Sequence, residues 1–259
     1  MPRIAIPVPH SSNVEYAERA MPQYERAVEM AGGEAVRVPL DLSVAEAQHI
    51  AESCDGVLLP GSNADVDPAK FHAERSAMTA AADAWRENAD MLLLRDAYAR
   101  RKPVLGICYG LQSLNVFREG SLVQHIPDFL PESTKNLVNH EAGSKVAVAH
   151  AVEIDRDSRL ARILKAAGAG NSDTFVLPVN SSHHQSAENV GDGLRIVARC
   201  PDDGVVEAVE GTAADHFVVA VQWHPERSVE EDAAARAIFS ALIAAAKEYA
   251  PRRAASGRD

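Results

Sequence analysis

Short runs of apolar and often β-branched residues alternate along the first half of the chain with segments whose apolar positions repeat at the period of a helix. The apolar runs predict strands at 3–8, 34–40, 56–60 and 104–107. The helical pattern predicts helices at 22–32, 44–53 and 83–101. This order is typical of βαβ units, in which parallel strands form a central sheet covered by helices.

Several residues mark where the expected helices begin. Pro22 fits the first turn of a helix, where its missing N–H group costs no hydrogen bond. Ser43 with Glu46 has the spacing of a capping box, and so does Ser228 with Glu231. Each of these two pairs therefore predicts a helix that begins directly after its serine.

The second half of the chain is less regular. Its pattern predicts strands at 144–154, 174–180 and 216–223, and helices at 158–168 and 233–250. Residues 194–210 contain two apolar runs around a Pro-Asp-Asp-Gly turn, which indicates a β-hairpin. No internal repeat or long linker divides the sequence. We therefore expect one α/β domain over 1–250, followed by a frayed basic tail at 251–259 that begins with Pro251.

Charge and hydropathy argue against several kinds of partner. The 37 acidic residues outnumber the 26 Lys and Arg residues and give a net charge of −11, which disfavours binding to nucleic-acid phosphates. No apolar run approaches the roughly 18 residues of a membrane-spanning helix. The N-terminal residues MPRIAIPVPH also lack the pattern of a secretory signal. We expect a cytoplasmic protein that binds neither nucleic acid nor membrane.

Three cysteines, Cys54, Cys108 and Cys200, stand at wide and irregular spacing. An odd number at such spacing fits neither a disulfide framework nor a CxxC metal site, so each thiol is considered by itself. Neither Cys54 nor Cys200 lies at a turn from a strand into a helix. We therefore expect both thiols to be structural or incidental.

Cys108 lies between two glycines in GICYG, residues 106–110, after an apolar strand and before a helical pattern. This is the form of a nucleophile elbow, in which a sharp turn exposes the side chain and small neighbours avoid clashes. The N-terminus of the following helix favours a thiolate and offers free amides for an oxyanion. A small buried core cysteine is the alternative, which the elbow alone does not exclude.

A base for such a thiol is present in VVAVQWHPE, residues 218–226. His224 directly follows an apolar strand, and in extended backbone residues 224 and 226 point to the same side, so Glu226 could orient the imidazole. Pro225 favours that extended backbone at His224. An exposed turn after the strand is the alternative for His-Pro-Glu alone.

Four segments, LLPGS, PVLGICYGLQSLNV, VNSSHHQ and VVAVQWHPE, occur in this order from Ile4 to about Glu226. Their order and spacing resemble the class I glutamine amidotransferase-like proteins, and more narrowly the γ-glutamyl-γ-aminobutyrate hydrolase family, or peptidase family C26. The resemblance implies a flavodoxin-like three-layer α/β fold with a mostly parallel sheet and a β-hairpin extension. It also implies no cofactor and, at the level of the family, a homodimer.

The resemblance assigns roles to particular residues. It implies a catalytic triad of Cys108, His224 and Glu226, and an oxyanion hole formed by the amide of Tyr109 with that of Gly61 or Ser62. It further implies substrate-binding roles for Gln112, Asn180, Ser181, His183 and Gln185.

Two positions depart from the family pattern. Many relatives have a second glycine where this chain has Ser62, which leaves the second oxyanion donor open. Relatives also tend to have small residues where Arg118 and Glu119 stand, so a wall of the substrate pocket could differ here.

Two features invite a metal interpretation. His183 and His184 are neighbours, and neighbours in an extended segment point to opposite faces, so they form a poor chelating pair. Asp65 and Asp67 in NADVDP are explained more simply by capping of their loop. We expect no metal site.

Together these patterns favour a cysteine hydrolase that cleaves small γ-glutamyl amides through a thioester. A glutaminase subunit that delivers ammonia to a separate synthetase is an alternative, although no synthetase domain follows in this chain. A non-catalytic binding module of the same fold is another, but a binder has no need of the thiol. A DJ-1-like protein would leave the His-Pro-Glu segment unexplained. The amine released cannot be named from the sequence.

Overall fold

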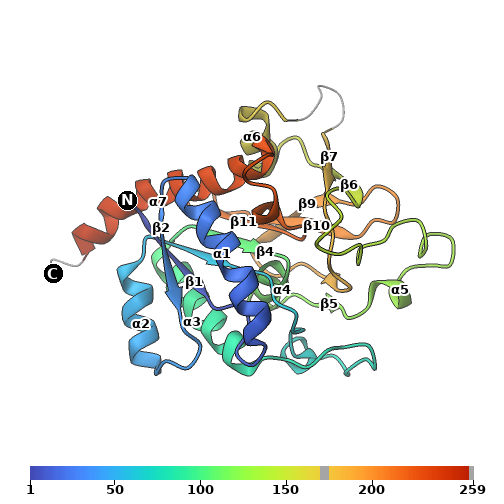
Figure 1. Ribbon diagram of the computed structural model, residues 1–259, viewed down its shortest axis with the longest axis horizontal. Coiled ribbons are helices and arrows are strands. Elements are labelled where there is room, and N and C mark those ends of the chain that lie inside the picture. Colours follow the sequence, from blue (N-terminus) through green and yellow to red (C-terminus); the bar gives the residue numbers. More distant parts are fainter. Residues whose placement is uncertain (170–174, 257–259) are drawn as a thin grey trace.

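The computed structural model describes residues 1–169 and 175–256, which form three layers: a central sheet between two groups of helices (Figure 1). The expected α/β fold is confirmed. Within the described residues, nine strands make up this sheet in the order β2-β1-β3-β4-β11-β10-β9-β6-β7. A separate two-stranded sheet pairs β5 (Leu122–Val123) with β8 (Ser186–Ala187).

The sheet has a parallel half and an antiparallel half. Parallel pairing joins β2 (Glu34–Val38), β1 (Arg3–Pro7), β3 (Gly56–Leu59), β4 (Val104–Ile107) and β11 (Val218–Val221). Antiparallel pairing then adds β10 (Val206–Gly211), β9 (Leu194–Arg199), β6 (His150–Ile154) and β7 (Val176–Val179). The predicted hairpin is confirmed as β9 and β10, and it extends the central sheet itself.

Strand residues alternate between two apolar cores because successive side chains point to opposite faces. Ile4 and Ile6 pack on one face, which is covered by α1 (Val14–Met30), α6 (Arg159–Ala166) and α7 (Ala233–Ser256). Ala5 faces the other core, covered by α2 (Val44–Ser53), α3 (Ala84–Arg100) and α4 (Tyr109–Phe117). Burial on both faces explains why these strands are continuously apolar.

The remaining described helices are single turns: η1 (Pro68–Phe71), α5 (Ile126–Phe129) and η2 (Pro225–Arg227). Of the helices in residues 1–169 and 175–256, none combines the length and hydropathy needed to cross a membrane. The capping box of Ser43 and Glu46 is confirmed at the start of α2.

The predicted start of the first helix is wrong. Helix α1 begins at Val14, because the Asn13 side chain accepts a hydrogen bond from the Tyr16 amide and caps the helix there. Pro22 lies inside the helix. Proline removes the hydrogen bond to the carbonyl of Glu18, and Glu18 is exposed, so water can satisfy that carbonyl.

The second capping box and the end of the last helix also differ from expectation. Asp232 caps α7, since its carboxylate accepts from the Ala234 amide at 2.8 Å. Ser228 and Glu231 are joined instead by a backbone turn, Glu231 N to Ser228 O at 3.1 Å. The helix continues through Pro251 to Ser256 and does not end before the proline.

Two predicted strands are shorter than the pattern suggested. The strand expected at 144–154 is confirmed only from His150, because residues 144–148 are exposed and pair with no other strand. In the strand expected at 174–180, Thr174 lies outside the described residues, and β7 begins at Val176.

The contact between α4 and β3 leaves no room for a side chain at Gly110. A Cβ atom there would lie 2.2 Å from the carbonyl oxygen of Leu59, a backbone atom that cannot move away alone. Gly110 therefore allows α4 to pack directly on the sheet.

We expect Gly110→Ala to lower the free energy of unfolding by at least about 3 kcal/mol, because the added methyl group overpacks this contact. Gly168→Ala is the control: Gly168 has φ 75° with nothing within 4 Å of an added Cβ, so only backbone strain of about 1 kcal/mol is expected. Urea denaturation measures both. Equal losses would contradict the packing explanation.

Candidate active site

Cys108 occupies a sharp turn between β4 and α4. Its backbone has φ 53° and ψ −108°, a conformation that non-glycine residues rarely adopt. The Cys108 amide donates to the carbonyl of Val221 at 2.8 Å, which ties the turn to the end of β11. This geometry is the predicted nucleophile elbow, and it places the thiol at the carboxyl edge of the parallel strands.

His224 follows β11 by three residues and therefore reaches the same edge. Its Nδ1 lies 2.7 Å from Oε1 of Glu226, and both side chains are buried. The two side chains meet through the short helix η2, which begins at Pro225, and not through the extended backbone that the sequence suggested. Since a carboxylate only accepts, Nδ1 donates to Glu226 and Nε2 is left for chemistry.

Gly61 brings the sulfur and the imidazole into one small space. A Cβ at Gly61 would lie 3.0 Å from Cε1 of His224 and 3.7 Å from Cβ of Cys108. The two side chains therefore border the same residue, as a nucleophile and its base must. The loop glycine is needed here because a larger residue would displace the imidazole.

The surroundings of His224 favour its protonated form. Burial lowers the pKa of His224, but Glu226 and Cys108 outweigh burial and raise it to about 9. Burial raises the pKa of Glu226, yet His224 and Arg227 bring it below its usual value. At neutral pH the histidine is thus an imidazolium held by an ionised carboxylate.

Asn180 holds the backbone of His224. Its side-chain nitrogen donates to the His224 carbonyl at 2.9 Å, and its side-chain oxygen accepts from the His224 amide at 2.9 Å. Both ends of the amide are thereby used within the protein. The resemblance assigned Asn180 to substrate binding, whereas its contacts here are those of a residue that positions His224.

The expected oxyanion donors are not equivalent in the structure. The Gly61 amide donates to the hydroxyl of Tyr24 at 3.0 Å. Within the described residues, the amides of Ser62 and Tyr109 make no hydrogen bond. Tyr109 N–H lies at the N-terminus of α4, where amides point out of the helix. Ser62 with Tyr109 is therefore the better pair for an oxyanion.

The other residues assigned to the substrate form a packed wall. Gln112 Nε2 donates to the carbonyl of Gln185 at 3.2 Å and to Gln222 Oε1 at 3.3 Å. The Ser181 hydroxyl donates to the carbonyl of His140 at 2.8 Å. The Gln185 side chain donates to the carbonyl of Gln124 at 3.1 Å. Their hydrogen bonds are with the protein, and contact with a substrate stays a prediction.

Arg118 and Glu119 lie at the far end of α4 from Cys108. Arg118 ends the helix, donates to Asp192 at 2.9 Å and covers the ring of Tyr98. A nine-residue helix is about 13 Å long, so these residues do not line the space at the sulfur. Glu119 has φ 69°, a left-handed conformation that favours glycine.

Sequence reasoning missed a buried arginine beneath the site. Arg86 is fully buried, bonds Asp90 at 2.7 Å, and donates to the carbonyls of Pro9 and Pro60 at 3.1 and 2.6 Å. Its guanidinium also lies 4.8 Å from the centre of the Tyr109 ring. Arg86 therefore joins the ends of β1 and β3 to α4. In the sequence, the burial of Arg86 could have been recognised only from a charged residue at an otherwise apolar position of the helix.

The other two thiols are structural, as expected. Cys54 and Cys200 are buried, and burial raises the pKa of Cys54 and that of Cys200, the latter to about 12. Of the two loop aspartates, Asp67 makes the expected capping turn, and Asp65 does not. Asp67 caps η1, and Asp65 accepts from the Ala80 amide at 2.6 Å and pairs with His184.

A cluster that could hold a metal ion was missed. His183 and His184 do point apart, His183 toward Glu207 and His184 toward Asp65. However, His183 joins two histidines from distant segments around Glu207. Comparing only adjacent residues could not reveal a set of this kind.

The comparisons with known proteins agree with this geometry. The family model of peptidase C26 matches residues 6–226. The chain belongs to the peptidase C26 family. The γ-glutamyl-γ-aminobutyrate hydrolase PuuD of Escherichia coli strain K12 is 32% identical over 231 residues, which is 88% of this chain and 86% of that protein.

Two further relatives define the wider group. A Mycobacterium tuberculosis protein, Rv2859c, named as a candidate glutamine amidotransferase, is 37% identical over 89% of this chain and 68% of its own length. The glutaminase domain of Trypanosoma brucei CTPS superposes with a TM-score of 0.60 at 17% identity, covering 96% of this chain and 94% of that domain. This second likeness shows the fold alone, and both place this C26 protein among the glutamine amidotransferase folds.

We expect Asn180→Ala to lower the free energy of unfolding by about 2 kcal/mol or more, because it leaves two buried backbone groups of His224 without partners. Asn136→Ala is a matched control, since Asn136 is exposed and its loss should cost under about 0.5 kcal/mol. Urea denaturation measures both. If the two variants were equally stable, the side chain of Asn180 would not hold His224.

Proposed function

We propose that this protein hydrolyses γ-glutamyl amides of small amines, with Cys108 as nucleophile, His224 as acid and base, and Glu226 as the residue that orients the imidazole. The observation that carries the proposal is the buried His224–Glu226 pair at the same sheet edge as a cysteine held at positive φ. Membership of the C26 family and the hydrolase activity for which PuuD is named support the choice of substrate.

In the first half of the reaction, the sulfur of Cys108 attacks the carbonyl carbon of the γ-amide and a C–S bond forms. Negative charge develops on the carbonyl oxygen, where the Ser62 and Tyr109 amides can donate to it. One such donor is commonly worth about 10²–10³-fold in rate. His224 Nε2 then gives its proton to the amine nitrogen, the C–N bond breaks, and a thioester remains.

In the second half, a water molecule takes the place of the amine. His224, now neutral, removes a proton from this water while its oxygen attacks the thioester carbonyl. The C–S bond breaks, and glutamate is released. The imidazole now holds the proton taken from water and is again an imidazolium, and the sulfur is free for another turnover. Glu226 keeps the Nδ1 proton in place through both halves, which leaves Nε2 free to exchange protons.

A glutaminase that supplies ammonia to a separate synthetase is a second candidate. The name of the Mycobacterium relative favours it. The two reactions use the same triad and differ in the leaving group, ammonia or a substituted amine. A panel of glutamine and γ-glutamyl conjugates of γ-aminobutyrate, polyamines and amino acids separates them by kcat/KM.

We expect Cys108→Ala to abolish hydrolysis across this panel, a loss of at least about 10⁴-fold in kcat, because no other group can form the thioester. Wild-type protein quenched in acid during turnover should carry one glutamyl group on the Cys108 peptide by mass spectrometry. Cys54→Ala is the control, since Cys54 is buried away from this edge and its loss should leave kcat unchanged. Turnover that persists in Cys108→Ala would refute the mechanism.

The pKa of His224 sets the expected pH profile. The imidazolium is needed to protonate the departing amine, so kcat/KM should fall as pH rises through about 9. Glu226→Gln removes the carboxylate that raises this pKa, so the alkaline fall should move to lower pH and kcat should drop about 10²-fold or more. An alkaline limb that does not move in Glu226→Gln would show that another group titrates.

A further inference from the structure

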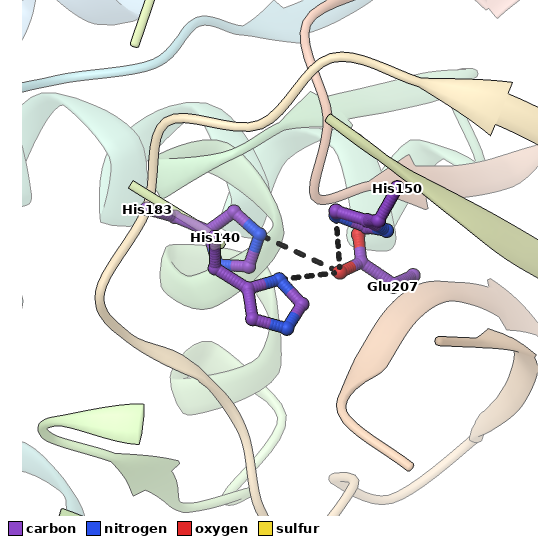
Figure 2. A group of neighbouring side chains, drawn as sticks. All are labelled: His140, His150, His183 and Glu207. Atoms are coloured by element: carbon purple, nitrogen blue, oxygen red, sulfur yellow. Dashed lines mark ion pairs between the residues drawn. The ribbon is translucent and has the colours of Figure 1, made fainter. Parts of the chain in front are cut away.

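Three histidines and one glutamate from separate segments meet inside the antiparallel half of the molecule. His140 precedes β6, His150 begins β6, His183 follows β7, and Glu207 lies in β10. All four are buried, and their nearest ligand atoms lie within 4.8 Å of one another. Figure 2 shows the three rings turned toward one oxygen of the Glu207 carboxylate.

The ion pairs within this cluster are longer than ordinary charge-assisted hydrogen bonds to a carboxylate. Oε1 of Glu207 lies 3.3 Å from His140 Nδ1, 3.4 Å from His150 Nε2 and 3.5 Å from His183 Nε2. Charge-assisted N–H···O⁻ bonds measure about 2.7–2.9 Å. Among the described residues, none of these four atoms has a hydrogen-bond partner, although all are buried.

The same distances fit ligands that share one metal ion. A tetrahedral zinc ion has ligands about 2.0–2.1 Å away, which places the ligand atoms about 3.3–3.4 Å from one another. Oε1 of Glu207 lies at about this spacing from each of the three nitrogens, and all four buried atoms lie within 4.8 Å of one another, which is the arrangement of a coordination shell.

The outer nitrogen of each histidine is fixed by an acceptor. His140 Nε2 lies 2.8 Å from Asp203 Oδ2, His183 Nδ1 lies 2.9 Å from the Gln185 carbonyl, and His150 Nδ1 lies 3.1 Å from the Ala151 carbonyl. Carbonyl and carboxylate oxygens only accept, so each outer nitrogen carries the proton. In a neutral ring the inward nitrogen then presents a lone pair, which is the usual outer arrangement of metal-binding histidines.

Without a metal ion, this cluster buries the negative charge of Glu207 among three imidazoles, of which His140 carries a proton at neutral pH. Burial raises the pKa of Glu207, but the surrounding histidines lower it to about 2, so the carboxylate is ionised. Burial lowers the pKa of His183, which favours its neutral form. A proton on His140, whose pKa Asp203 and Glu207 raise to about 9 against the effect of burial, is the competitor of a metal.

We propose that His140, His150, His183 and Glu207 bind one zinc ion, or a zinc-like divalent transition metal, in a closed structural site. Three imidazoles and one carboxylate suit zinc better than Mg²⁺ or Ca²⁺, which prefer oxygen ligands. Because the protein would fill all four coordination positions, no position is left for a catalytic water. The ion would therefore cross-link the segments that carry its ligands. A cleft of about 280 Å³, lined in part by His140, His183 and His184, offers an entry route.

The proposed ion would fix the segment that supports the catalytic histidine. His183 lies three residues after Asn180, which holds the backbone of His224, and two before Gln185, whose carbonyl accepts from Gln112. Binding His183 to Glu207 of β10 would anchor this segment to the central sheet. His140 and His150 would anchor the long connection before β6 to the same point.

The test uses full-length protein whose affinity tag has been removed, because a polyhistidine tag binds metal itself. Elemental mass spectrometry should find about one zinc ion per chain in protein from cells grown with zinc. After treatment with a chelator, added Zn²⁺ should raise Tm by at least about 5 °C. Added Co²⁺ should produce the visible absorption typical of a four-coordinate site.

Glu207→Gln and His150→Asn should each lose the metal and the rise in Tm. The matched control is His216→Asn, which removes a buried histidine that donates to the Lys102 carbonyl at 2.7 Å outside the cluster, and it should bind zinc normally. The proposal would be overturned if wild-type protein contained no zinc, showed no rise in Tm with added Zn²⁺ and gave no four-coordinate cobalt spectrum. That result does not depend on whether the variants fold, nor on the hydrolase activity.

Discussion

The parallel pairing of β4 with β11 is the constraint on which the proposed chemistry depends. Ile107 stands beside Val221 in this pairing, so the segments that carry Cys108 and His224 leave the sheet at the same edge. The hydrogen bond from the Cys108 amide to the Val221 carbonyl extends the pairing by one residue into the turn itself. Two residues 116 positions apart are thereby held together by backbone, before any side-chain contact is made.

The parts of the fold that the sequence predicted are those with a local cause. The capping box at Ser43 and the Pro-Asp-Asp-Gly turn each act within a few residues, and both are confirmed. Pro22 led to a wrong prediction of where α1 begins, because proline fits the first turn of a helix but was also tolerated inside this one. The helix begins earlier, where Asn13 caps it. A capping box at Ser228 was wrong because Asp232 offered a cap nearer to the apolar stretch.

The sequence could place Cys108 and His224 directly after two apolar strands, and the structure brings these segments to one edge of the sheet, whereas their catalytic roles stay a prediction. The role of Asn180 could not be predicted, since it depends on a loop from the antiparallel half lying against His224. Arg86 was missed for a similar reason: its carbonyl partners come from two other strands. The histidine cluster needed four segments to be placed at once, and residue spacing carries no information of that kind.

The backbone of Cys108 has a further consequence. A cysteine at φ 53° costs about 1–3 kcal/mol relative to a residue that adopts this conformation freely, so the fold is less stable with Cys108 than with glycine in that place. Replacing Cys108 by glycine would relieve this strain, but it would also remove the sulfur on which the proposed thioester depends. The backbone strain and the proposed reactivity therefore belong to the same residue.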